Sequence, residues 1–178
     1  LRISTEVGEL ESVLVHTPGA ELRAVTPGNK GDYLYDDLIQ VDGAQREHRR
    51  FVAVLERFAK VHQIADLLAE ALERPEAREY FIRATLDVVP SEGLGRQLSD
   101  LPAGALARLI IEGVEAEGGA IARAINTVGY VLPPLPNLFF PRDIGVVIGS
   151  HAVVGSMRYG VRWTEELVIK TLFAFHPA

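Results

Sequence analysis

The pattern of apolar and polar positions predicts alternating strands and helices at the start of the chain. Residues 10–18 are rich in β-branched side chains and end in a Pro–Gly pair, which predicts a strand and a turn. Between residues 43 and 60, apolar positions alternate at spacings of four and three, which predicts a helix with one apolar face. The face consists of Ala44, His48, Phe51, Leu55 and Phe58. The following segment "VHQIAD" predicts a second strand, so we expect the order strand, loop, helix and strand in the first part of the chain.

The middle of the chain has a helical pattern. From about residue 64 to residue 118, apolar positions keep a helical spacing and we expect a small helical insertion. Prolines mark the expected helix starts and serines are the expected caps. These are Pro75, Pro90 and Pro102, with Ser91 and Ser99.

Strand patterns return from Tyr130 onward. The segments "IGVVIG" and "HAVVGSM" predict two strands, joined by Ser150 and His151 or by a bulge. The segment "TEELVIKTLFAFHP" predicts a final helix, capped by Thr164, with Glu165 and Glu166 at its positive end.

Composition places the chain among ordinary globular proteins. Its 178 residues are 48% apolar and 24% charged, with a net charge of −6, which fits one domain or one domain with an insertion. Basic residues are scattered among acidic ones, so we expect no nucleic-acid partner. The sequence contains no cysteine, no apolar run that could cross a membrane and no signal-peptide pattern, and we expect a cytoplasmic protein. The chain begins at Leu1 without an initiator methionine, which leaves open whether it is a fragment.

Few side chains are arranged as a metal or catalytic motif. The five histidines form no His-x-x-x-His pair, so we expect no zinc site. His48 is interpreted as a hydrogen-bonded core histidine. The pair Asp36 and Asp37 could bind a cation, although such pairs more often cap turns.

The stretch "LPNLFFPRD", residues 135–143, brings an aspartate to the start of an apolar hairpin. A carboxylate there must be solvated or paired, because an isolated buried charge is very costly. Asp143 could pair with Arg142 or bind a cationic ligand, and a guanidinium suits a carboxylate because two parallel N–H bonds can form. Arg158 and Arg162 precede the final helix, where they could meet an anionic group or face water.

The order of several segments resembles the N-terminal half of arginine deiminase, a member of the guanidine-modifying pentein superfamily. The segments are "VGELESVLVHTPGAEL", "YDDLIQVDGAQREHRRFVAVL", "DLLAEAL", "LSDLPAGALARLIIEGV", "LPNLFFPRD" and the segment from Met157 to Glu165. The resemblance implies an α/β fold, part of a pentein β/α propeller of ββαβ modules with a small all-helical insertion. The first module would then span residues 1–63, the insertion 64–118, and the continuation of the propeller 119–178. The C-terminal half of the family is absent.

The resemblance also implies roles for four residues. Asp143 matches a catalytic carboxylate that grips the substrate guanidinium, and Arg162 matches an arginine that pairs with the substrate's α-carboxylate. Asn137 matches a substrate-contacting asparagine and Phe140 a pocket aromatic. Pro141 replaces the more usual threonine, which puts the local strand pairing in doubt.

The implied activity is hydrolysis of L-arginine to L-citrulline and ammonia through a covalent intermediate on a cysteine, without a metal or organic cofactor. Because this chain lacks the cysteine, we expect it to be inactive alone. Two alternatives stay open: another guanidine-modifying pentein, acting on agmatine, methylarginine or an amidino donor, or a non-catalytic protein that binds arginine or a partner. We also expect a homo-oligomer, or association through the surface of the incomplete propeller.

Overall fold

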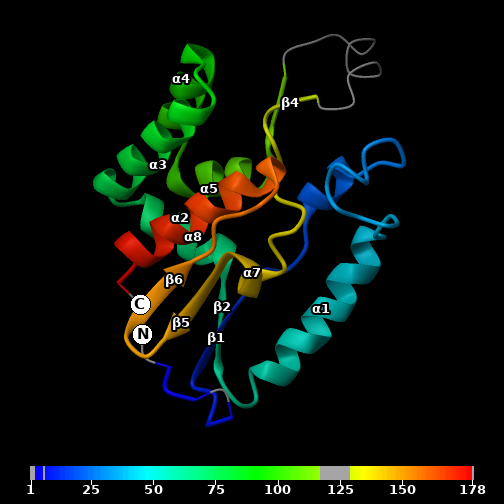
Figure 1. Ribbon diagram of the computed structural model, residues 1–178, viewed down its shortest axis with the longest axis vertical. Helices are drawn as coiled ribbons and strands as arrows, with labels where there is room; N and C mark the ends of the chain where they lie inside the picture. The colour runs from blue at the N-terminus through cyan, green and yellow to red at the C-terminus, as the bar shows by residue number, and fades with distance from the viewer. Residues whose placement is uncertain (1–2, 6, 117–128, 178) are drawn as a thin grey trace.

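The computed structural model describes residues 3–5, 7–116 and 129–177. Within these ranges it combines helices with three separate two-stranded sheets (Figure 1). The α/β class is therefore confirmed at the level of mixed helices and strands. The pentein propeller and the three predicted regions stay predictions, and the expected boundary at residue 118 lies outside the described residues.

The first sheet pairs β1, Ser12–Val15, with β2, Lys60–Gln63, in parallel. Parallel neighbours need a crossover connection, which here contains the 3-10 turn η1, Ala20–Ala24, and helix α1, Val41–Leu55. The predicted order of strand, loop, helix and strand is confirmed.

Helix α1 was expected to bury its apolar face, and in the described structure it does not. None of its residues is buried, and Phe51 and the nearby Phe58 are 53% and 71% exposed. Figure 1 shows α1 standing apart from the other helices. The predicted core position of His48 is wrong, because this residue is only half-buried. The predicted hydrogen bond is present, because its Nδ1 lies 3.1 Å from Thr17 Oγ1.

Four helices follow β2, as the helical pattern predicts. They are α2, Ile64–Leu72, α3, Pro75–Val88, α4, Glu92–Asp100, and α5, Ala103–Glu112. Ser91 caps α4 by accepting a hydrogen bond from Leu94 N–H at 3.2 Å, as predicted. Ser99 caps no helix: it lies inside α4 and its hydroxyl donates to Gly95 O at 2.8 Å.

Two antiparallel sheets complete the strands of the described residues. Strand β3, Val114–Glu115, pairs with β4, Tyr130–Leu132. Strands β5, Gly145–Ile148, and β6, His151–Val154, form a hairpin. Its loop begins one residue earlier than expected, at Gly149, whose φ of 60° suits the first position of a tight hairpin turn.

The final helix α8 spans Trp163–Phe175 and begins one residue before its predicted cap. Thr164 therefore lies inside the first turn and does not cap the helix; its hydroxyl is buried without a hydrogen-bond partner. Glu165 and Glu166 occupy the first turn, as predicted.

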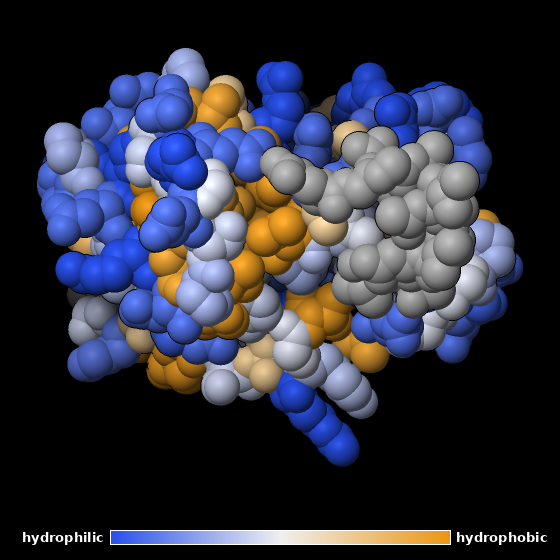
Figure 2. Space-filling view, turned by 90° about the horizontal axis from the view of Figure 1, so that it is seen from above, coloured by the Kyte–Doolittle hydropathy of each residue, from blue (hydrophilic) through white to orange (hydrophobic). Residues whose placement is uncertain are grey.

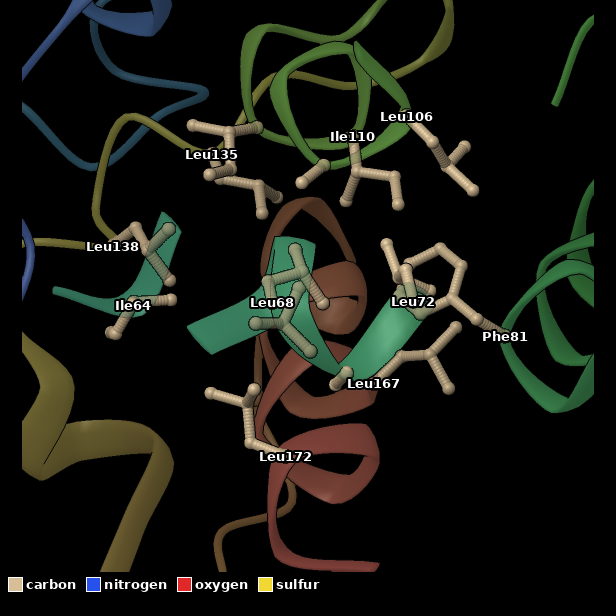
Figure 3. Packing of buried hydrophobic residues seen from close by; sticks show 14 of the residues in the cluster. Ile64, Leu68, Leu72, Phe81, Leu106, Ile110, Leu135, Leu138, Leu167 and Leu172 are labelled. Carbon is tan, nitrogen blue, oxygen red and sulfur yellow. The ribbon is translucent and has the colours of Figure 1, made fainter. Parts of the chain in front are cut away.

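The core is centred on α2, which packs between α5 and α8 (Figure 3). Ile64, Leu68 and Leu72 are completely or almost completely buried there, and each such side chain contributes about 1.5–3 kcal/mol of hydrophobic stabilisation. Leu135 and Leu138 pack onto the same cluster. The core thereby fixes the segment that leads to Asp143 and, through α8, the segment that carries Arg162.

Candidate functional site

Asp143 lies in a single helical turn, α7, Pro141–Ile144, directly before β5. Pro141 occupies the first helical position, where its missing N–H costs nothing, so it interrupts no strand. Ile144 is fully buried and anchors the turn, whereas the Asp143 side chain is 50% exposed. The turn thus presents a carboxylate at the surface from a fixed base.

Asp143 forms an ion pair with Arg162. Its Oδ2 accepts a hydrogen bond from Arg162 Nη1 at 2.9 Å. Arg162 ends the 3-10 turn η2, Gly160–Arg162, and is only 8% exposed. Of the two environments that the sequence left open for Arg162, the solvated one is therefore wrong; the anionic group that it meets is a carboxylate of the chain itself, and contact with a ligand stays a prediction.

A second carboxylate, Glu165, completes this cluster. It is 1% exposed and accepts hydrogen bonds from Arg162 Nε at 3.0 Å to each oxygen and from Nη2 at 2.7 Å. The sequence analysis placed Glu165 only at the positive end of a helix. Its spacing of three residues from Arg162 was the available signal, because such residues are neighbours on a helical surface.

The charge of the cluster is held by mutual pairing. Burial alone would lower the pKa of Arg162, but hydrogen bonds and charges of Glu165 and Asp143 raise it above its ordinary value. Burial raises the pKa of Glu165, even though the hydrogen bonds from Arg162 oppose that shift. Arginine stays protonated in proteins, so the three donated hydrogen bonds keep a charge-assisted pair in the interior.

The loop after β1 lies beside this cluster. Burial raises the pKa of Tyr35, and the charges of Glu165 and Glu21 raise it further. Glu21 is buried against His16, with Oε1 and Nε2 3.1 Å apart. Tyr35 donates its hydroxyl hydrogen bond to Pro136 O at 2.6 Å, which ties this loop to the segment that carries Asp143.

The structure links Asn137, Phe140 and Asp143 through their backbone. Phe140 N–H donates to Asn137 O at 3.0 Å, and Asp143 N–H donates to Phe140 O at 3.1 Å. The Asn137 side chain is buried and donates to Tyr33 O at 3.0 Å. The Phe140 ring is exposed, so it is accessible for a contact with a ligand.

Four other kinds of feature could mark a functional site in the described residues: metal-binding groups, the Asp36–Asp37 pair, a surface hollow and membrane-spanning helices. They hold no group of three or more His, Cys, Asp or Glu side chains that could bind a metal ion. Asp37 Oδ1 accepts the N–H of the next residue, Leu38, at 2.7 Å. A surface hollow of about 500 Å³ lies along α3, but its Arg78 is bound to carbonyls at the end of α4, including Ser99 O at 2.7 Å. In the ranges that are described, no helix has the length and apolar character needed to cross a membrane.

Comparisons with known proteins identify relatives of the chain. A family model described as arginine deiminase matches residues 31–101 and 104–178. Arginine deiminases of Rhodococcus erythropolis and Mycolicibacterium gilvum are 34% and 35% identical to the chain, covering 99% of it and 47% and 48% of their own lengths. The arginine deiminase of Mycobacterium tuberculosis strain H37Rv is 35% identical and covers 98% of the chain. The chain spans about half the length of these curated relatives.

The match confirms the resemblance that the sequence segments indicate, and it includes the stretch that carries Asn137, Phe140, Asp143 and Arg162. The matched residues cover far more than half of the chain, and the relatives share about a third of its positions. The chain belongs to the arginine deiminase family.

Proposed function

We propose that this chain supplies part of the substrate site of an enzyme that hydrolyses L-arginine to L-citrulline and ammonia. The observation that carries the proposal is the half-exposed carboxylate of Asp143, which already accepts a hydrogen bond from a guanidinium, that of Arg162, at 2.9 Å. A substrate guanidinium would use the same kind of contact, and a carboxylate can accept two parallel N–H bonds from it.

The proposed roles follow the sequence prediction. Asp143 grips the guanidinium of the substrate, and Arg162 meets its α-carboxylate. Asn137, whose side chain is buried, contacts the substrate, and the exposed ring of Phe140 is a pocket aromatic that covers the aliphatic part of the substrate. The cysteine that would form the covalent intermediate is not among these 178 residues, so the chemical step needs protein that this sequence does not contain.

A non-catalytic protein that binds arginine or a partner chain is the second candidate, and the absence of cysteine would favour it only if the natural protein consisted of these 178 residues. The intact mass of the protein in its source cells separates the two. A mass near 19.5 kDa supports the binding protein, whereas roughly twice that mass supports the enzyme. Agmatine, methylarginine and amidino donors are the other guanidino substrates to compare with L-arginine in the same assays.

We further propose that the chain associates with another protein surface, either a second copy or further modules of a propeller. Apolar side chains are exposed on α1, in the turn that follows it and on the β5–β6 hairpin, including Phe51, Phe58 and Ile148. Figure 2 shows that hydrophobic residues also gather at the centre of the face seen from above, between hydrophilic ones. Exposed apolar side chains that form a contiguous patch are typical of interaction sites. A cytoplasmic location stays a prediction.

A chimera tests the enzymatic proposal. Residues 1–178 are fused to the C-terminal half of the Rhodococcus erythropolis arginine deiminase, and citrulline formation from L-arginine is measured. We expect turnover by the chimera and none by the 178-residue chain. The matched control carries the N-terminal half of the Mycobacterium tuberculosis relative. If this control is active while our chimera melts cooperatively but forms no citrulline, the proposal is wrong.

A further inference from the structure

Arg162 makes two kinds of contact, which differ in burial. Its Nε and Nη2 face Glu165, which is almost inaccessible to solvent, while its Nη1 faces the half-exposed Asp143. A buried carboxylate that lost its partner would remain as an uncompensated charge, whereas Asp143 can be solvated. The contact with Glu165 is therefore the permanent one and the contact with Asp143 is the exchangeable one.

The pairing of Arg162 with Glu165 also determines how much negative charge Asp143 can offer to a ligand. Arg162 carries one positive charge and faces two carboxylates, so Glu165 balances it and Asp143 leaves the cluster with one negative charge in excess. Without Glu165, Arg162 would neutralise Asp143 and weaken its attraction for a cationic ligand. The two carboxylates therefore have different tasks.

We infer that Glu165 is a positioning residue: it holds the Nε–Nη2 edge of Arg162 and leaves the Nη1 end for the carboxylate of a bound amino acid. This inference rests on the proposed function, because it assumes that the ligand brings its own guanidinium to Asp143. The half-exposed Asp143 side chain then turns from Arg162 to the ligand guanidinium, and the Nη1 end becomes free while Glu165 keeps the Arg162 side chain in place. Glu165 has no contact with the ligand in this arrangement.

The first test measures the position of Arg162 without any ligand. In a ¹⁵N–¹H spectrum of the 178-residue chain, the Nε–H of Arg162 should exchange with water at least about tenfold more slowly than exposed arginines. Asp143→Asn should preserve this protection and Glu165→Gln should abolish it. Glu166→Gln, on the next residue of α8, is the matched control and should change nothing. Protection that survives Glu165→Gln, or that is lost only in Asp143→Asn, would overturn the inference.

Glu165→Asp covers the case in which Glu165→Gln does not fold. The shorter carboxylate keeps the charge but cannot reach both nitrogens equally well, so the Nε–H should exchange several-fold faster than in the wild type. Unchanged exchange in a folded Glu165→Asp protein would contradict the positioning role.

The second test uses L-arginine and agmatine, which differ in the α-carboxylate. Titration calorimetry should show that Glu165→Gln reduces the preference for L-arginine over agmatine by about tenfold, while Glu166→Gln leaves it unchanged. In an Arg162→Gln background, the Glu165 change should have less than a twofold further effect, because it acts through Arg162. If Glu165→Gln lowers stability but leaves the preference for L-arginine unchanged, Glu165 has only a structural role and the inference is wrong. If the wild-type chain binds neither compound, its part of the site does not hold a ligand alone; the chimera then tests the proposed function, and the exchange measurement still decides the position of Arg162.

Discussion

Replacing Asp143 with asparagine should weaken ligand recognition far more than it weakens the fold. The side chain is 50% exposed and contacts Arg162 through one oxygen at 2.9 Å. Ion pairs at this level of exposure contribute at most about 1 kcal/mol, because solvent screens them. Glu165 still neutralises Arg162 in the variant, so no buried charge loses its partner.

The effect on the ligand is larger because the asparagine has no charge and offers only one acceptor. Losing a charge-assisted contact to a guanidinium should cost on the order of 3 kcal/mol, which is a decrease of about a hundredfold in kcat/KM for L-arginine. Turnover is measured on the chimera with the Rhodococcus C-terminal half, and unfolding on the 178-residue chain in urea. Asp87→Asn, an exposed aspartate in α3, is the matched control for both measurements.

Arg162→Gln, in the same cluster, should weaken the fold strongly, unlike Asp143→Asn. It leaves Glu165 buried without a cation, which should cost about 3–5 kcal/mol and lower the melting temperature by roughly 6–20 °C. If Asp143→Asn destabilises the chain by more than about 2 kcal/mol while kcat/KM stays within twofold, Asp143 is a structural residue and the assignment is refuted.

Three further predictions concern the core, the exposed helix and pH. Phe81→Ala should destabilise the chain by about 3–5 kcal/mol in urea unfolding, because Phe81 is fully buried; a loss below 1 kcal/mol would contradict the packing. Replacing both Phe51 on α1 and Phe58 in the turn after it with serine should weaken association in sedimentation velocity without loss of stability, and unchanged association would exclude these two side chains as part of the contact surface. Burial raises the pKa of Tyr33 to about 12, so the unfolded state loses this proton first and stability should fall between pH 10 and pH 12; Tyr33→Phe should flatten that slope in denaturation at several pH values.

The sequence was sufficient where structure depends on neighbouring residues. Strands β1, β2, β5 and β6 and helix α8 follow from alternation, helical spacing and turn residues, which act over a few positions. Ser91 was correctly predicted as a cap, but Ser99 was not, because a serine near a proline looks the same whether it ends one helix or begins the next. Periodicity also indicated the apolar face of α1, yet it carries no information about what covers that face.

The candidate site was only partly predictable, because its contacts join residues that are distant in sequence. The family resemblance identified Asp143 and Arg162, but it assigned them to opposite ends of a substrate, whereas in the structure they contact each other. Their separation of 19 residues gives no local signal for this pair. Glu165 was missed as a member of the site because an acidic residue in a first helical turn already has an explanation in the helix dipole.

The cluster depends on the core as much as on its charges. Asp143 is placed by Ile144, and Arg162 by the start of α8, and both elements pack onto the hydrophobic cluster around α2. A hydrogen bond is sensitive to a shift of a few tenths of an ångström, so a cavity beneath either element would disturb the pair without touching it. Under the proposed function, this rigid apolar base would let Glu165 and the core hold Arg162 while Asp143 accepts the guanidinium of a ligand without loss of the fold.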